Sequence, residues 1–566
     1  MARPTRAAKP LRLLSRLEHL LTEFGAEPAA RKRELVRALA SRSLPNASAV
    51  RRLHEALCYL RAYPDDADLL QQVVGVLDQF DARADLRQHR RKLVDSGIAG
   101  TTIRYAFFAD TARWLSRRHP GALRIDWSRF DNEATLAGKL DLLTTWAETP
   151  GLDEVDLDTA AWLRRLAGPD TSGADFLIAR CATLGATAAE RDDFWDELDP
   201  PLELHARPGT PSRSRAALSG RPLHFQTGPL DRQRPDLRAA VRQRARELPC
   251  GEELGARIIT LAREAMVLRH RDLDAFVHAD AGDVRLFACG QGLEFAVVGV
   301  QPERRLLLEA VYAFLTLKNG VPIGYVLVSA LFGSSEIAYN VFDTWRGGEA
   351  GRIYGHVLAV TRQLLGSDTF TIYPYQLGGG GNDEGLRSGA WWFYQKLGFR
   401  ARDPGVLRVM AQELARQQRR PQHRTPVSTL ARIAEHNVFW SDGAQRDDIL
   451  GVFPLGHIGL AVTDYLARRF GADRERGERT CADEAAVLCG VRGWLKWSDG
   501  ERLWWQRWSP LLLALPGVAK WTPAERSALV DVVRKKGGRR ESDFVRALDG
   551  HRRLRRALQR LAATTT

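Results

Sequence analysis

The segment SGAWWFYQKLGF, residues 388–399, decides how the middle of this chain is interpreted. Residues 390–394, Ala-Trp-Trp-Phe-Tyr, are apolar around a whole helical turn, which predicts a helix buried between a sheet and a neighbouring layer. A buried tyrosine hydroxyl needs a partner. Tyr394 is therefore either a core residue bonded to a backbone carbonyl or a functional group.

The residues before this segment predict a β-rich region. From Asp283 the periodicity becomes extended and the residues become β-branched and aromatic, in the runs 284–300, 306–320, 321–333 and 335–343. Turn residues at 318–320 and 332–335 predict antiparallel hairpins. A glycine-bearing turn and helix at 344–366, a strand at 368–377, and a helix capped by Asn382 follow. The expected order is hairpins, helix, strand, helix, strand.

This order and three motifs resemble the GNAT N-acetyltransferase superfamily, over about residues 245–410. FYQKLGF at 393–399 is similar to the F-Y-x-x-x-G-F segment that follows the fifth strand of many members. RGGEAG at 346–351 is similar to the R-G-x-G-x-G/A loop that receives the pyrophosphate of acetyl-CoA, and NGVPIGYVLV at 319–328 looks like the second and third strands. The resemblance implies an α+β fold whose central mixed sheet is flanked by helices.

The resemblance also implies roles for particular residues. Tyr394 would protonate the departing thiolate, and the strand backbone at Val341 and Phe342 would hold the pantetheine arm of acetyl-CoA or another acyl-CoA. The phosphates would bind to Arg346, Gly347, Gly348, Ala350 and Gly351. Physical chemistry is consistent with this loop, because glycines leave N–H groups uncovered at a helix N-terminus, where anions are favoured. A tight turn that merely feeds a helix is the alternative.

Glu349 departs from the family's pattern, which usually has glycine at its position. A carboxylate aimed at a pyrophosphate would repel it. Either Glu349 turns outward, or this loop does not bind the cofactor in the usual way.

A transferase also needs a group that removes a proton from the attacking amine. Side chains alternate along residues 335–342, so Glu336, Ala338 and Asn340 share one face of the strand. Members of the family often use a glutamate on the fourth strand or an ordered water, so the resemblance makes Glu336 the leading candidate for the base. An exposed glutamate near a hairpin tip is the competing interpretation.

Composition shifts divide the chain. Residues 1–206 have a helical pattern, and RPGTPSRSRAALSGRP at 207–222 predicts a linker within a lead-in that extends to 244. The GNAT-like region is assigned to 245–412, and residues 413–566 are expected to form a helical domain rich in tryptophan. Both flanking regions are expected to be all-α. The tryptophans are expected to pack in a core, although stacking on nucleobases is the alternative.

The chain has a formal net charge of +14, which favours acidic partners such as nucleic acid or phosphate-bearing cofactors. The six cysteines lack ligand spacing, so no metal site is expected. The N-terminus has no apolar segment like that of a signal peptide, and no membrane span is expected, so a cytoplasmic protein is predicted.

The resemblance implies acyl transfer from acyl-CoA to an amine of an unknown acceptor, a small molecule or a protein, by direct attack through a tetrahedral intermediate. Two alternatives stay open. One is a non-catalytic adaptor with a GNAT-like scaffold between helical interaction domains. The other is a transferase that takes aminoacyl-tRNA as its donor.

Overall fold

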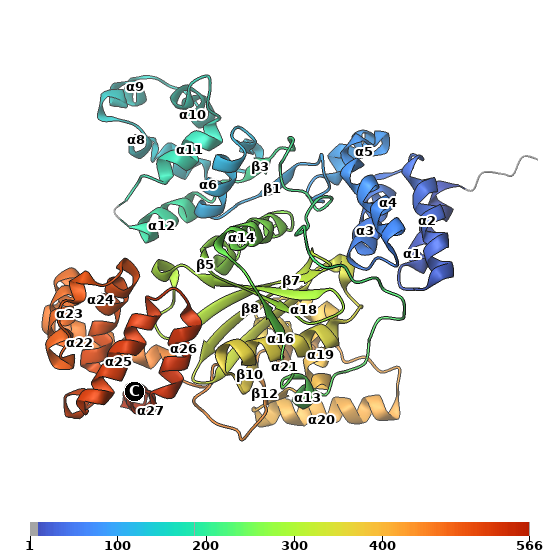
Figure 1. Ribbon diagram of the computed structural model, residues 1–566. Helices are drawn as coiled ribbons and strands as arrows, with labels where there is room; N and C mark the ends of the chain where they lie inside the picture. Colours follow the sequence, from blue (N-terminus) through green and yellow to red (C-terminus); the bar gives the residue numbers. More distant parts are fainter. Residues whose placement is uncertain (1–8, 186, 565–566) are drawn as a thin grey trace, which may run out of the picture. The chain divides into compact units, whose positions relative to one another are not determined.

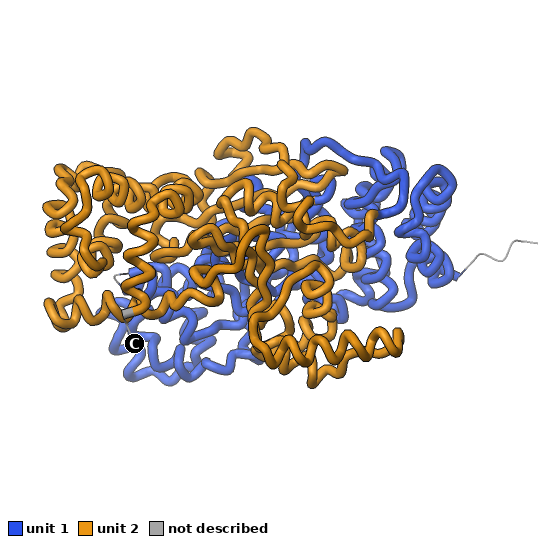
Figure 2. Tube along the Cα trace, turned by 90° about the horizontal axis from the view of Figure 1, so that it is seen from below, with its two compact units in different colours: residues 1–230, 257–278, 318–322 blue, residues 231–256, 279–317, 323–566 orange. Residues whose placement is uncertain are grey.

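The computed structural model describes residues 9–185 and 187–564. The chain divides into two compact units (Figure 2). Unit 1 contains the described residues up to 230, together with 257–278 and 318–322. Unit 2 contains 231–256, 279–317 and the described residues from 323 onward. Both units are therefore assembled from segments that are far apart in the sequence. This differs from the consecutive domains that the composition suggests.

Unit 1 is mainly helical (Figure 1). Its helices are α1 (Pro10–Leu20), α2 (Ala26–Ala40), α3 (Ala47–Ala62), α4 (Ala67–Asp78), α5 (Ala84–His89), α6 (Ala109–Arg118), α7 (Glu133–Ala137), α8 (Leu140–Leu143), α9 (Thr149–Glu154), α10 (Thr159–Ala167), α11 (Gly173–Cys181), α12 (Ala188–Leu198) and α15 (Asp274–Val277). Most of α14 (Glu252–Val267) also belongs to this unit.

The prediction that residues 1–206 are all-α is corrected by a small antiparallel sheet. Its strands, in the order β1-β3-β2, are β1 (Ile103–Tyr105), β3 (Leu202–Leu204) and β2 (Leu123–Ile125). Three residues are too few to establish a period of two, and the central strand comes from a distant part of the chain. The sequence pattern therefore could not reveal this sheet.

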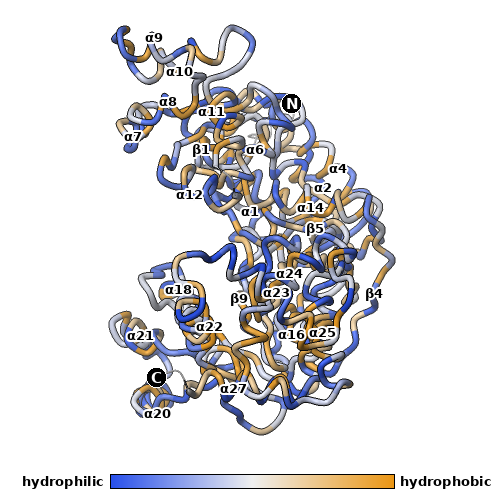
Figure 3. The backbone as a smooth tube through the Cα atoms, turned by 90° about the vertical axis from the view of Figure 1, so that its left-hand side faces the viewer, coloured by the Kyte–Doolittle hydropathy of each residue, from blue (hydrophilic) through white to orange (hydrophobic). Residues whose placement is uncertain are grey.

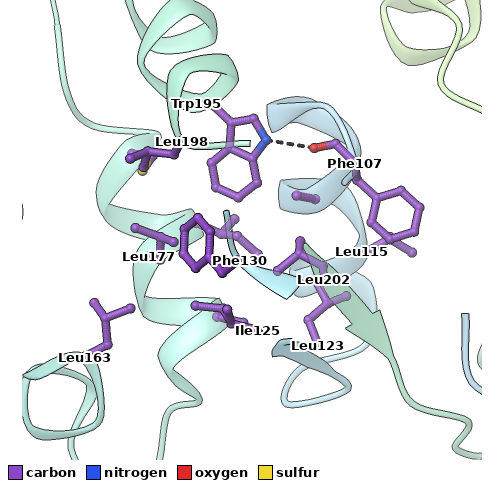
Figure 4. Close-up of a cluster of buried hydrophobic side chains, with 14 of the residues drawn as sticks. Phe107, Leu115, Leu123, Ile125, Phe130, Leu163, Leu177, Trp195, Leu198 and Leu202 are labelled. Atoms are coloured by element: carbon purple, nitrogen blue, oxygen red, sulfur yellow. Dashed lines mark hydrogen bonds between the residues drawn. The ribbon is translucent and has the colours of Figure 1, made fainter. Parts of the chain in front are cut away.

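A hydrophobic cluster lies beneath this small sheet (Figure 4). Side chains from β2 and β3 meet those of α6, α11 and α12 there, and Leu177, Leu198 and Leu202 are almost completely buried. The Trp195 Nε1–H donates to the Phe107 carbonyl over 2.7 Å, so the one polar atom of this indole is satisfied.

Residues 207–222, predicted as a linker, are instead packed into unit 1. The buried Arg61 guanidinium donates to the carbonyls of Ser214 (2.7 Å) and Arg213 (2.9 Å), and Ser214 is fully buried. Arg213 in turn forms an ion pair of 2.6 Å with Glu55. Proline, glycine and serine indicate irregular backbone here, but hydrogen bonds from α3 hold that backbone in place.

Unit 2 is organised by a mixed sheet of nine strands. In spatial order they are β11 (Arg400–Ala401), β12 (Val438–Ser441), β10 (Thr369–Ile372), β9 (Ser334–Val341), β8 (Val321–Leu331), β7 (Ala310–Lys318), β6 (Leu293–Val300), β5 (Ala279–Ala288) and β4 (Arg246–Leu248). The fold class is therefore α+β, with a large mixed sheet flanked by helices, as the sequence predicted.

The two predicted turns form at the expected places. Asn319 and Gly320 join β7 to β8 with φ of 50° and 76°, and Phe332 and Gly333 join β8 to β9 with φ of 51° and 70°. Two consecutive residues with positive φ are typical of the turns that suit two-residue hairpins. β8 and β9 pair antiparallel along the whole of β9.

β9 and β10 are parallel neighbours, but they pair over three residues only. Ser334, Ser335 and Glu336 lie opposite Thr369, Phe370 and Thr371. β10 ends at Ile372 and the chain turns into a short helix, whereas β9 continues to Val341 beside β8. We call the point after Glu336, where the two strands stop pairing, the β9–β10 fork.

Helices surround this sheet and form the C-terminal part of unit 2. They are α13 (Leu237–Ala240), α16 (Ala350–Leu365), α17 (Pro374–Leu377), α18 (Asp383–Ser388), α19 (Ala390–Leu397), α20 (Pro404–Arg419), α21 (Val427–Ala434), α22 (Leu455–Phe470), α23 (Arg474–Cys489), α24 (Asp499–Ala514), α25 (Pro523–Lys536), α26 (Glu541–Gly550) and α27 (Arg552–Thr564). The capping box predicted at Thr522 and Glu525 opens α25.

Residues 413–566 are not all-α, because β12 lies between β10 and β11 in the sheet. The three tryptophans of α24 pack as predicted. Trp504, Trp505 and Trp508 of α24 are each at most 1% exposed, and their indole N–H groups donate to backbone carbonyls over 2.8–3.1 Å. These three buried rings cannot stack on nucleobases.

The described helices mix hydrophilic and hydrophobic residues along their length (Figure 3). Among them, none combines the length and the apolar character that crossing a membrane requires.

Candidate functional site

Glu336 lies at the β9–β10 fork, as the last residue of β9 that pairs with β10. Its side chain is partly buried. Burial and, secondarily, the neighbouring carboxylate of Glu309 raise the pKa of Glu336 to about 7. The carboxyl group therefore exchanges its proton near neutral pH, which is the property that a general base requires.

Two further groups lie beside Glu336. Glu309 immediately precedes β7, and burial raises its pKa, whereas nearby Lys536 lowers it. Tyr373 follows β10, and burial followed by Glu336 and Glu309 raises the pKa of its phenol. Sequence reasoning missed both residues, because neither lies in a recognisable motif and the sheet alone brings them to Glu336.

Tyr394 lies in α19, within a cluster of aromatic rings. Its ring is 5.5 Å from that of Tyr354 in α16, and 5.2 Å and 5.7 Å from those of Phe393 and Phe399. Tyr339 of β9 contacts the Tyr354 and Phe393 rings. Tyr394 is 3% exposed, and burial raises the pKa of its phenol. A phenol with a raised pKa stays protonated and can act only as a donor near neutral pH.

The local backbone places Tyr394 within this cluster. The helix expected to begin after Asn382 is divided, because Gly389 adopts a φ of +71° and separates α18 from α19. Gly398, with a φ of +106°, then ends α19, and the Phe399 N–H donates to the Tyr394 carbonyl over 3.1 Å. Phe399 is fully buried, so this left-handed C-cap anchors the end of the helix. The N-cap predicted at Asn382 is present, because its Oδ1 accepts from the Gly385 N–H.

The glycine loop, residues 346–351, leads into α16 and ends within its first turn. Within the described part of the chain, the N–H groups of Gly347, Gly348, Ala350 and Gly351 make no hydrogen bond. Four unsatisfied donors at the start of a 16-residue helix form a favourable environment for an anion.

Arg346 is half-exposed and lies at the edge of this loop. Its guanidinium forms ion pairs with Asp343, at 2.9 Å, and with Glu384 of α18, and it donates to the Val341 carbonyl over 3.1 Å. These partners hold Arg346 in the absence of an anion. A bound phosphate would have to compete with two carboxylates for it.

Glu349 does not turn outward. It is 3% exposed at the N-cap position of α16, and its carboxylate forms an ion pair of 2.9 Å with Arg352 one turn later. Burial, with a further contribution from Arg352, lowers the pKa of nearby His356 to about 4. The sequence left two possibilities, an outward carboxylate or a loop that does not bind the cofactor in the usual way. The structure shows a third arrangement, in which the carboxylate stays within the first turn of α16 and Arg352 of the chain itself offsets its charge.

The backbone at Val341 and Phe342 is partly engaged already. The Phe342 N–H donates to the Ile323 carbonyl over 2.9 Å, and the Val341 carbonyl accepts from Arg346. Val341 pairs with Gly324 of β8. Its other edge faces away from β8, on the side where β10 no longer accompanies β9.

Substituting Glu336 tests its burial without any assay of activity. The folded-state pKa lies above the ordinary value of 4.5, so the folded protein holds this proton more tightly than the unfolded chain. The free energy of unfolding should therefore fall as the pH rises from 4.5 to about 7. We expect Glu336→Gln, which keeps a neutral side chain, to be more stable than the wild type at pH 8 by about 1–3 kcal/mol, and nearly equal to it at pH 4.5. Urea unfolding at both pH values measures this; equal differences at the two pH values would contradict the raised pKa.

Among the described residues, no group of three or more His, Cys, Asp or Glu side chains is arranged to hold a metal ion. In comparisons with protein-family models, with curated proteins and with solved structures, no match was found.

Proposed function

We propose that unit 2 is a GNAT-like acyltransferase that moves an acyl group from acyl-CoA to an amine. The observation that carries the proposal is the β9–β10 fork, with Glu336 at its vertex and a pKa of about 7. A parallel strand pair that separates leaves backbone groups of β9 unpaired, and an extended pantetheine arm can use them. The order of hairpins, helix, strand, helix and strand around the fork supports the same assignment.

The chemistry divides between the two sides of the fork. Glu336 would take one proton from the ammonium form of the amine, which frees the nitrogen lone pair to attack the thioester carbonyl, and the nitrogen would lose its second proton to solvent as the tetrahedral intermediate collapses to the amide. As the carbon–sulfur bond breaks, Tyr394 would donate its phenolic proton to the leaving thiolate, and solvent would restore it. The four free N–H groups of the glycine loop would bind the pyrophosphate. Because Glu309 accompanies Glu336, the acceptor that fits best is an amine that arrives as a cation.

The release of CoA thiol tests this function directly. Purified protein is incubated with acetyl-CoA and a panel of amines (polyamines, aminoglycosides and lysine peptides), and a thiol-reactive chromophore records the product. We expect release that depends on the amine and on the enzyme. Release that does not depend on an amine, or none with any member of the panel, would contradict the proposal.

The position of Glu349 favours one alternative to acyl-CoA as the acyl donor. The buried carboxylate lies within the turn where a pyrophosphate would bind. A donor without a pyrophosphate, such as aminoacyl-tRNA, would avoid this repulsion, and the net charge of +14 suits such a donor. Failure of acetyl-CoA, combined with transfer from charged tRNA, would establish this alternative. If neither acetyl-CoA nor charged tRNA supports transfer, the remaining hypothesis is the non-catalytic adaptor.

Acetyl-CoA should stabilise the protein by mass action, and the glycine loop should control the size of the effect. At a ligand concentration 100 times Kd, the stabilisation is about 2.7 kcal/mol, which corresponds to a shift in Tm of several degrees. We expect Arg346→Ala to reduce this shift and Glu349→Gln to increase it, because the second change removes a negative charge and releases Arg352. Differential scanning fluorimetry measures the shifts.

Arg387→Ala is the matched control, because Arg387 is an exposed arginine of α18 outside the loop and pairs with Asp383. It should leave the shift unchanged. A smaller shift in Glu349→Gln than in the wild type would contradict the repulsion argument.

A further inference from the structure

A cavity of about 660 Å³ lies within unit 1 and belongs to none of the elements of the β9–β10 fork. Its walls come from the region around α5, from residues 99–100, from 206–212 and 215–216, and from Glu264 of α14. The wall formed by residues 206–212 and 215–216 belongs mostly to the segment 207–222, which the sequence predicted to be a linker. A volume of this size is typical of sites for small molecules.

Four arginines line the cavity: Arg87, Arg90, Arg207 and Arg215. Two of them are held by the protein, because Arg207 donates to the Pro120 carbonyl over 3.0 Å and Arg215 pairs with Asp81 at 2.7 Å. The guanidinium groups of Arg87 and Arg90 form no ion pair with any described residue. The lining carboxylates are Asp81, already paired, and Glu264, whose pKa is raised by burial. The cavity therefore has an excess of positive charge.

The wall at 207–212 contributes an ordered turn and an unused hydroxyl. Pro208 and Gly209, with a φ of +85° at Gly209, occupy the centre of a turn that the Thr210 N–H closes on the Arg207 carbonyl over 3.1 Å. This geometry is typical of a type II turn, and it fixes the start of the Arg207 side chain. Ser212, which also lines the cavity, is 6% exposed, and its buried Oγ has no hydrogen-bonding partner in the described structure. A buried hydroxyl without a partner is costly, and because this Oγ has almost no accessible surface, the Ser212 side chain would have to rotate toward the cavity to bond a ligand oxygen.

We propose that this cavity binds a phosphorylated small molecule. Guanidinium groups match phosphate oxygens in geometry and charge, and both unpaired arginines come from the α5 region. The lining set has no aromatic side chain, so no ring in it would stack on a nucleobase. Leu86, Ala99 and Pro211 supply apolar surface instead. A sugar phosphate fits this combination better than a nucleotide does.

Calorimetric titration of the full chain with ribose 5-phosphate, AMP and inorganic phosphate tests the site. We expect ribose 5-phosphate to bind more tightly than inorganic phosphate and at least as tightly as AMP. Arg87→Gln and Arg90→Gln should each weaken this binding by 10-fold or more, and Ser212→Ala by a smaller factor. The substituted arginines are exposed and unpaired, so the variants should keep the circular dichroism and Tm of the wild type.

Arg37→Gln is the control, since Arg37 is an exposed arginine of α2 in the same unit. It should bind like the wild type. The absence of binding with all three probes at 10 mM would overturn the proposal. So would an equal loss of binding in Arg37→Gln, which would indicate attraction to the net charge rather than to the cavity. Tighter binding of AMP than of ribose 5-phosphate would overturn the sugar-phosphate assignment.

Discussion

Replacing Glu336 by Gln is expected to lower kcat/KM for amine acylation by about 10³-fold, a loss within the range for a positioned general base. The variant keeps the size of the side chain and removes its ability to accept a proton. The wild type should gain activity as the pH rises through about 7, because Glu336 must be deprotonated to act and burial has moved its pKa there. Glu336→Gln should lose this limb of the profile.

Glu309→Gln gives a sharper form of the test. The Glu309 carboxylate contributes to the raised pKa of Glu336 by repulsion. Removing that charge should move the rising limb of the pH–rate profile to lower pH while leaving the limb in place. Glu303→Gln, at an exposed position in the turn after β6, is the control and should change neither rate nor profile. An unchanged profile in Glu336→Gln would exclude Glu336 as the base.

Tyr394→Phe is expected to lower turnover by about 10²-fold or more while leaving the protein folded. The substitution removes one oxygen and keeps the ring, so its contacts with Tyr354, Phe393 and Phe399 remain. If Tyr394 is only a core residue, activity should persist and the stability should change by roughly 1 kcal/mol. Turnover and Tm must be measured on the same preparation.

Tyr375→Phe provides the comparison, because Tyr375 is a 60% exposed tyrosine of α17 outside the aromatic cluster. It should retain full activity. A fully active Tyr394→Phe variant would end the assignment of Tyr394 as the proton donor. Water would then have to protonate the leaving thiolate, with Glu336 still acting as the base.

Local signals predicted the local features of this chain. Asn319-Gly320 indicated the hairpin turn because both residues tolerate positive φ, and Thr522 with Glu525 indicated a helix start because their side chains satisfy its first N–H groups. The burial of Trp504, Trp505 and Trp508 followed from their hydrophobic area. In each case the physical cause lies within a few residues of the signal.

Features that depend on distant partners could not be predicted in this way. The fork exists because 369–371 pairs with 334–336 and then turns away, and Glu309 reaches Glu336 through the sheet. The segment at 207–222 resembles a linker in composition, yet Arg61 of α3 holds it in place. Gly389 separates α18 from α19 because its backbone adopts a positive φ. A single glycine permits this conformation, but its presence in a sequence does not predict it.

A structure of the protein with acetyl-CoA, or with a non-reactive analogue of it, tests the central proposal most directly. We expect the pantetheine arm along the free edge of β9 beyond Glu336, the pyrophosphate at the N–H groups of Gly347, Gly348, Ala350 and Gly351, and the thioester between Glu336 and Tyr394. A ligand absent from the β9–β10 fork at millimolar concentration, or bound elsewhere on the chain, would contradict it.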